Sequence, residues 1–243
     1  MVVCDSPGTA PLEETPMHYE IRYQPSYALA VVTLDANERF RAEAGAMVSM
    51  DESIQIETKT GGGLGSVLRR TVLGGETLFV NDMVATRDGS QLTLAPVLPG
   101  DIAAVELGPG QELYVQSGSY MASSPEVVVD TKFGAGKTFF SGEGLFLLKL
   151  TGPGTVLLSS YGAIAQIDLA AGESHIVDTG HMVAFDATMG YEIRRAGNSW
   201  KTTLVGGEGL VVRISGPGRF LFQTRSPGGF LSWLIPQIPQ RSN

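Results

Sequence analysis

The stretch most suggestive of chemistry is GAGKT, residues 134–138, which has the ending of a phosphate-binding P-loop. A P-loop also needs a glycine five positions before Gly136, and that position holds Thr131. It must lead into a helix whose N-terminal amides hold the phosphates, whereas Thr138 is followed by FFSGEG, a pattern typical of a loop before a strand. We therefore interpret the stretch as a glycine-rich turn with an exposed Lys137, and expect no nucleotide site.

A second stretch, IVDTGHMVAF at 176–185, is similar to the Asp-Thr-Gly motif of aspartic proteases. Those enzymes use two such aspartates that share a proton. Here His181 follows the glycine where a small residue is usual, and the chain holds no second Asp-Thr-Gly. The sequence therefore predicts no enzyme and no catalytic residue, although a hydrolase that uses Asp178 is the best enzymatic alternative. Asp178 and His181 are retained as candidate site residues.

Two further features could bind a ligand. His175 and His181 are six residues apart, so on one extended strand they would face the same side, where Glu173 could complete a metal site. The glycine-rich loop Gly61–Ser66 precedes two arginines and could hold a phosphate. There is no His-x-His pattern, and the loop fits a surface insertion, so we predict no metal and no cofactor. A small-ligand or metal-binding protein that uses either feature is the alternative function.

The repetition of the sequence is more informative than any single motif. One element is a glutamate followed six or seven residues later by a glycine and an apolar run; a second is Gly-Glu before an apolar strand. They alternate three times with a period of about 65 residues. The first element is ERFRAEAGAMV (38–48), ELYVQSGSYMA (112–122) and ESHIVDTGHMVA (173–184); the second is GGETLFV (74–80), SGEGLFLLKL (141–150) and GGEGLVVRI (206–214).

The second element places one carboxylate in each copy: Glu76, Glu143 and Glu208. If the three carboxylates converged, their repulsion would require a bound cation or a shared proton. Alternatively, each accepts backbone N–H bonds across its own glycine turn. All three are candidate site residues, and the sequence leaves both arrangements open.

Short apolar runs between glycine and proline turns predict an all-β protein. Gly-Pro-Gly, at 152–154 and 216–218, is incompatible with a helix or a central strand. We expect three small β-sandwich units, fused around a pseudo-threefold arrangement because a unit of this size is marginal alone. The expected organisation is a disordered leader at 1–16, β repeats at 17–100, 101–168 and 169–227 that form one compact domain, and an apolar, proline-containing tail at 228–243.

The composition limits the partners and the compartment. A net charge of −8 disfavours contact with nucleic acid. The single cysteine, Cys4, allows no internal disulfide, which fits a reducing compartment. The leader lacks the apolar core of a signal peptide, and no apolar run approaches the roughly 20 residues that span a bilayer. We therefore expect a cytoplasmic protein.

Spaced motifs over residues 17–235 give the chain a family resemblance. It resembles the bacterial and archaeal family of uncharacterised proteins related to the mitochondrial biogenesis protein named for altered inheritance of mitochondria. The resemblance implies a triplicated unit similar to the tryptophan RNA-binding attenuation protein fold, and a non-enzymatic, oligomeric role, with no catalytic residues to transfer. The motifs are EAGAMVSM (43–50), GGGLGS (61–66), GGETLFVN (74–81), APVLPGDI (95–102), SGEGLFLLKLTGPG (141–154), VDTGHMVAF (177–185), GGEGLVVRISGPG (206–218) and LFQTRSP (221–227).

The C-terminal tail is a candidate interaction segment because of Phe230, Trp233, Leu234 and Ile235. Its prolines prevent a spanning helix, so it could pack on its own domain, enter an oligomer interface or lie on a membrane surface. The sequence thus predicts a non-enzymatic structural or interaction scaffold that self-associates into a homo-oligomer, with an unknown protein partner or a membrane surface as a further partner.

Overall fold

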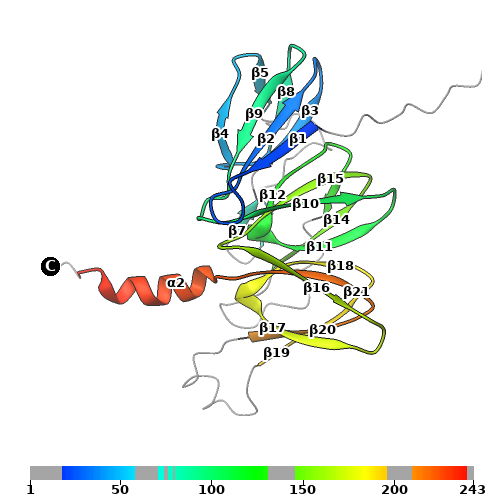
Figure 1. The fold of residues 1–243 in the computed structure, drawn as a ribbon, viewed down its shortest axis with the longest axis vertical. Coiled ribbons are helices and arrows are strands. Elements are labelled where there is room, and N and C mark those ends of the chain that lie inside the picture. Colours follow the sequence, from blue (N-terminus) through cyan, green and yellow to red (C-terminus); the bar gives the residue numbers. More distant parts are fainter. Residues whose placement is uncertain are drawn as a thin grey trace, which may run out of the picture.

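The computed structural model describes residues 18–57, 71–73, 76–78, 80–130, 146–195 and 210–239. The described chain is built almost entirely of antiparallel strands, with a single α-helix, α2, near its C-terminal end (Figure 1). The predicted all-β class is therefore confirmed. The strands fall into three successive groups that follow one another along the longest axis of the molecule.

The first group is a sandwich of two small sheets. One sheet has the order β1-β2-β9-β4, and in the other β3 and β5 flank β8. Among the described strands, the short strands β6 and β7 pair only with each other. The strands are β1 (His18–Arg22), β2 (Leu29–Leu34), β3 (Arg39–Glu43), β4 (Met47–Met50), β5 (Ile54–Glu57), β6 (Thr71–Leu73), β7 (Glu76–Leu78), β8 (Val80–Ala85) and β9 (Ser90–Leu94).

The second and third groups have the same pairing scheme as the first. In the second and third groups the first and third strands pair with the last, and the second and fourth pair with the last but one. In the first group the same scheme holds when strands are counted from β2, so that β2 is the first strand, β3 the second, β4 the third and β5 the fourth, and β1 is added beside β2. The second group is β10 (Ile102–Leu107), β11 (Glu112–Gln116), β12 (Tyr120–Ser123), β13 (Val128–Asp130), β14 (Leu147–Thr151) and β15 (Gly154–Ser159). The third is β16 (Ile164–Leu169), β17 (Ser174–Asp178), β18 (Met182–Asp186), β19 (Gly190–Arg195), β20 (Leu210–Ser215) and β21 (Gly218–Gln223).

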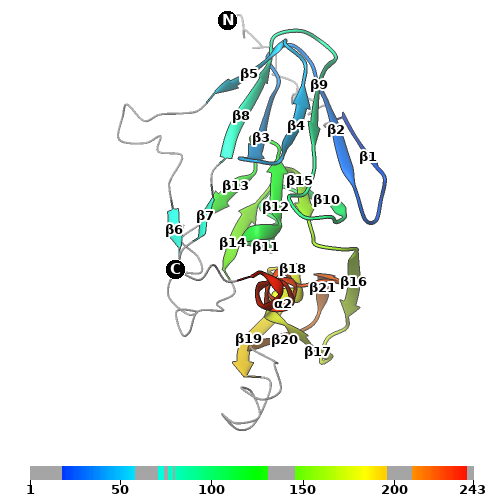
Figure 2. The same ribbon diagram turned by 90° about the vertical axis from the view of Figure 1, so that its left-hand side faces the viewer.

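Neighbouring groups are joined through their sheets. β12 pairs with β3, and β18 pairs with β11, so that two six-stranded sheets each run from one group into the next. Figure 2 shows the resulting row of three sandwiches from the side. A pseudo-threefold arrangement is not confirmed, because β4 and β17, which would have to meet to close it, do not pair with one another among the described strands. That the three groups are copies of one repeated unit stays a prediction.

The apolar side chains of the described strands form three core clusters. Phe40 is buried in the first, Tyr120 in the second and Phe185 in the third. Strand β9 shows how the sequence places them: Ser90, Leu92 and Leu94 are buried, while the residues between them are not, as the two-residue period of a strand requires. Each junction adds residues of one group to the core of its neighbour, which fixes adjacent sandwiches to one another.

The Gly-Pro-Gly stretches form turns before the last strand of the second and third groups. Their final glycines, Gly154 and Gly218, have φ values of +131° and +144°, which side-chain-bearing residues rarely adopt. A Cβ at Gly218 would lie 2.6 Å from Cγ of Met189. The predicted turns are therefore confirmed, and both backbone conformation and close packing explain this glycine.

Candidate functional site

Several predicted site residues lie outside the described part of the chain. These are Glu143, Glu208, the loop Gly61–Ser66 and the GAGKT stretch. Glu76 begins strand β7, but its side chain is not among those described. Convergence of the three repeated carboxylates therefore stays a prediction.

The carboxylate of Asp178 has a local structural role. It is the N-cap of the 3-10 helix η2 (Thr179–His181), where its Oδ1 accepts a hydrogen bond from the Gly180 N–H at 2.8 Å. Aspartate is a preferred cap because its oxygen satisfies an amide that has no partner within the helix. The Asp-Thr-Gly motif thus serves as the turn between β17 and β18, with this carboxylate bound to the backbone.

The two histidines of the predicted face do not share a strand. His175 lies in β17, whereas His181 ends η2, so the premise that both occupy one extended strand is wrong. The His175 ring lies against Phe220, with 5.6 Å between ring centroids, and His181 Nδ1 lies 2.7 Å from the carbonyl oxygen of Gln223. In the described part of the chain, no three His, Cys, Asp or Glu side chains are grouped so that they could hold a metal ion.

Gln223, which no sequence motif singled out, joins the segments around η2. Its side chain is buried, and its Oε1 accepts a hydrogen bond from the Tyr161 N–H at 2.8 Å. Its Nε2 donates to the carbonyl oxygen of Gly180 at 2.9 Å. The amide therefore links η2 to the segment that enters β16. Only the tertiary structure reveals this role, because a glutamine at the end of a strand carries no distinctive signal.

Helix α2 (Pro227–Leu234) begins next to η2 and Gln223 and continues into the 3-10 helix η3 (Ile235–Gln237). Ser226 is its N-cap and accepts from the Gly229 N–H at 3.2 Å, and Pro227 occupies the first turn, where its missing N–H is harmless. A Cβ at Gly180 would lie 2.7 Å from the Ser226 hydroxyl, so η2 and the start of α2 are closely packed. The ring of Phe230 meets Tyr161 at 5.9 Å in an edge-on contact.

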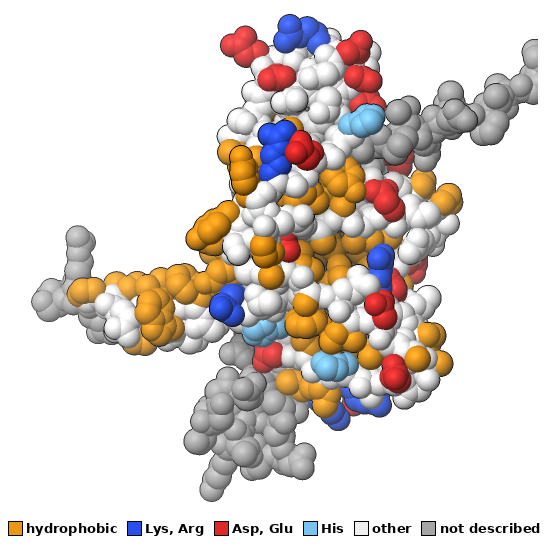
Figure 3. All heavy atoms as spheres, in the orientation of Figure 1, with side chains coloured by type: hydrophobic (Ala, Val, Ile, Leu, Met, Phe, Trp, Pro, Cys, Tyr) orange, Lys and Arg blue, Asp and Glu red, His pale blue; other side chains and the backbone are white. Residues whose placement is uncertain are grey.

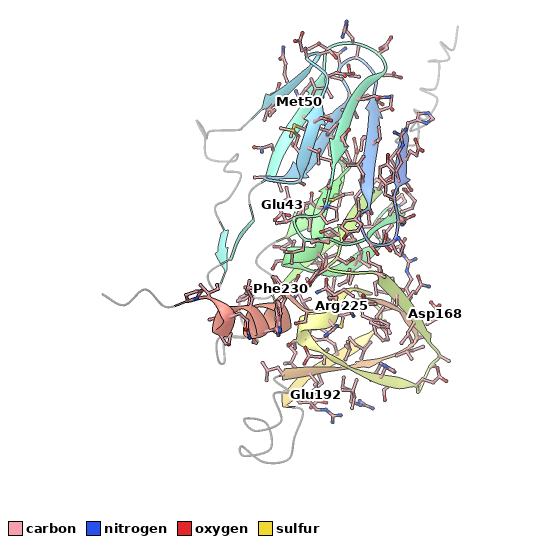
Figure 4. The ribbon with its side chains drawn as sticks, turned by 60° about the vertical axis from the view of Figure 1, so that its left-hand side comes forward. Glu43, Met50, Asp168, Glu192, Arg225 and Phe230 are labelled. Atoms are coloured by element: carbon pink, nitrogen blue, oxygen red, sulfur yellow. The ribbon has the colours of Figure 1, made fainter. Side chains whose placement is uncertain are left out.

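Beyond this base, α2 projects away from the sandwiches with an apolar surface. No residue of α2 or η3 is buried (Figure 3). Trp233 is 63% exposed and Ile235 is 61% exposed, while Phe230 and Leu234 are half-buried. Residues 227–238 contain no charged side chain. The base of this segment is thus held by a hydrogen bond and a ring contact, where Figure 4 labels Phe230, and its far end is exposed.

None of the helices in the described segments is long and apolar enough to cross a bilayer.

Comparisons with known proteins identify similar chains. The family model described as mitochondrial biogenesis AIM24 matches residues 19–225. The uncharacterised protein M6_Spy0233 of Streptococcus pyogenes serotype M6 is 30% identical over 236 residues, which cover 93% of this chain and 93% of that protein. The crystal structure of protein SPYM3_0169 from Streptococcus pyogenes is similar with a TM-score of 0.75 and 26% identity, over 91% of this chain and 100% of that one. The expected likeness to the RNA-binding attenuation protein fold stays a prediction.

Proposed function

The chain belongs to the mitochondrial biogenesis AIM24 family, as its motifs predicted, and we propose that it is a non-enzymatic, self-associating β scaffold that presents α2 as an apolar contact segment. The observation that carries this proposal is the apolar surface of the far end of α2 and of the 3-10 helix η3 that follows it. Leu231, Trp233, Ile235 and Ile238 are each about half exposed or more, on a segment whose base is held by hydrogen bonds and ring contacts.

Such a segment favours association over catalysis. Full burial of one large apolar side chain contributes about 1.5–3 kcal/mol, so covering several of them in an interface offsets a large part of the cost of association. The carboxylate of Asp178, the best candidate for a catalytic group, accepts a hydrogen bond from the backbone amide of Gly180 and so serves as a helix cap. A cytoplasmic location is part of the proposal and rests on the single cysteine.

The test is the oligomeric state of the full chain and of a tail variant. In the variant, Leu231, Trp233 and Ile235 are replaced by serine, which leaves the capping residue Ser226 in place. Sedimentation velocity over a range of concentrations is expected to show species heavier than a monomer for the full chain, and weaker association for the variant. Val128→Ser is the matched control, because Val128 is 61% exposed and lies on β13 in the second sandwich, which has no described contact with α2. A full chain that remains monomeric at every concentration would refute the proposal.

A further inference from the structure

The two junctions inside the chain are made in the same way. In each, the third strand of one sandwich pairs with the second strand of the preceding sandwich. In each, the third strand carries a β-bulge at its second residue. The residues paired directly after the bulge are Ala122 with Ala42 and Ser123 with Arg41 at the first junction, and Ala184 with Val115 and Phe185 with Tyr114 at the second.

At each end of the row, one strand of the kind that forms a junction has no partner from a neighbouring sandwich among the described strands. β4 is the third strand of the first sandwich, and it has the same bulge, between Met47 and Ser49. β17 is the second strand of the third sandwich. Among the described strands, β4 pairs only with β9, and β17 pairs only with β20. The two sandwiches lie at opposite ends of the long axis, so these edges do not face one another within one molecule.

Both free edges expose apolar side chains. Val48 is 56% exposed, Met47 and Met50 are 38% and 37% exposed, and Ile176 on β17 is 51% exposed. All four residues of β12, the strand that takes the place of β4 at the first internal junction, are buried. β4 thus has the composition of a strand within a junction but lacks its partner.

β4 differs from the other edge strands of these sheets in that it carries no charged residue. Natural proteins protect an exposed edge with charged residues, because its unpaired backbone groups otherwise bind a further strand. Among the end strands of the two six-stranded sheets, of the β1-β2-β9-β4 sheet and of the β17-β20-β19 sheet, β4 alone has no charged residue. The single charged residue of β17, Asp178, is bound at the cap of η2.

We propose that copies of this chain associate head to tail, with the β4 edge of one copy pairing antiparallel with the β17 edge of the next. This inference rests on the proposed self-association and adds the surface and the register. By the register of the internal junctions, Ser49 lies opposite Val177 of the second copy, and Met50 lies opposite its Ile176. The equivalent pair at the second internal junction is Phe185 with Tyr114, whose rings lie 5.3 Å apart, edge to face. The new contact therefore buries two exposed apolar side chains against each other.

Head-to-tail pairing determines the kind of assembly. Two copies joined in this way still leave one β4 edge and one β17 edge free. Association therefore continues until a ring closes, or extends as a filament, and it does not stop at a twofold dimer.

Disulfide trapping tests the register directly. In a Cys4→Ser background, chains with Met50→Cys are mixed with chains carrying Ile176→Cys and oxidised. Directly opposed residues of neighbouring strands have Cβ atoms roughly 4.5–5.5 Å apart, close to the reach of a disulfide. The mixture is expected to yield covalent dimers of one chain of each kind, while each variant alone yields none. Dimers formed by Met50→Cys alone would show that two β4 edges meet, and would overturn the proposal.

Charge variants test the same contact without oxidation. Met50→Glu and Ile176→Arg are each expected to weaken association by at least about tenfold. A mixture of the two chains is expected to recover dimers, because the Ile176→Arg chain keeps the native β4 edge and the Met50→Glu chain keeps the native β17 edge. The matched control is Val128→Arg, at a 61% exposed residue on the edge strand β13, which should leave association unchanged. If the full chain is oligomeric but neither edge variant weakens it and the mixture does not cross-link, the edge pairing is refuted and self-association stands. If the full chain is monomeric, both proposals fail.

Discussion

The substitution Gln223→Leu should destabilise the base of α2. Leucine retains most of the volume of the glutamine but provides neither a donor nor an acceptor. The Tyr161 N–H and the Gly180 carbonyl oxygen then lose the hydrogen bonds of 2.8 and 2.9 Å that the amide provides. Because Gln223 is only 7% exposed, little water reaches the site to replace it.

The magnitude follows from the two groups left without a partner. A buried polar group that loses its hydrogen bond costs about 1–3 kcal/mol. Tyr161 and Gly180 are only half-buried, so the lower part of that range applies, about 1–1.5 kcal/mol each. The free energy of unfolding should therefore fall by about 2–3 kcal/mol, and for a chain of this size the melting temperature should fall by about 4–12 °C.

Thermal and urea unfolding measure the effect, and Gln166→Leu provides the control. Gln166 lies on β16, next to β21, but is exposed and bonds only to Asp168 among the described contacts, so its replacement should change the stability by no more than about 0.5 kcal/mol. In a Trp200→Phe background, the fluorescence anisotropy of Trp233 should fall for Gln223→Leu as the helix base loosens. Equal melting temperatures for the two leucine variants would refute the assigned role of Gln223.

Two further predictions concern the framework. Burial raises the pKa of Tyr120 from 10.0 to about 12, so the folded state retains the phenolic proton where the unfolded state releases it. The stabilisation from this shift is fully present below pH 10 and is lost as the pH rises toward 12, so the free energy of unfolding should fall by about 1.4 kcal/mol between low pH and pH 11. Urea unfolding at pH 9 and pH 11 measures this loss, and the Tyr120→Phe variant should not show it. Gly218→Ala should lower the melting temperature clearly more than Gly172→Ala, because both glycines have positive φ but only at Gly218 would the new Cβ meet a neighbour, Met189; equal shifts would show that backbone strain alone matters.

Much of the fold could be predicted from the sequence. The runs that follow each Gly-Glu, and the Gly-Pro-Gly turns, indicated strands and their breaks because these signals are local. The arrangement of the sandwiches could not be predicted in the same way. A repeat of about 65 residues indicates units that bury their faces against one another, but it does not distinguish a closed threefold from an open row. That difference depends on whether β4 and β17 meet, which is a contact between residues far apart in the sequence.

The candidate site was predictable in part for the same reason. The apolar tail was visible in the residues around Trp233, and its exposure is a property of the fold. Motif reading gave Asp178 and His181 possible roles in chemistry, whereas their hydrogen bonds make them part of a turn that supports α2. Gln223 was missed because its importance comes from Tyr161 and Gly180, which are 62 and 43 residues away in the sequence.

The position of α2 relates the tail to the proposed edge contact. After β9 and after β15 the chain runs into the next sandwich, whereas after β21 it runs into α2, so the helix begins where a fourth sandwich would otherwise start. The third strand of such a sandwich would pair with β17, and in the proposed assembly β4 of a second copy takes that place. Because η2 directly follows β17 and packs against Ser226, the base of α2 lies beside that edge. The base of α2 therefore lies near the β17 edge on which Met50 of a second copy would dock, so the helix and the proposed edge contact are on neighbouring parts of the third sandwich.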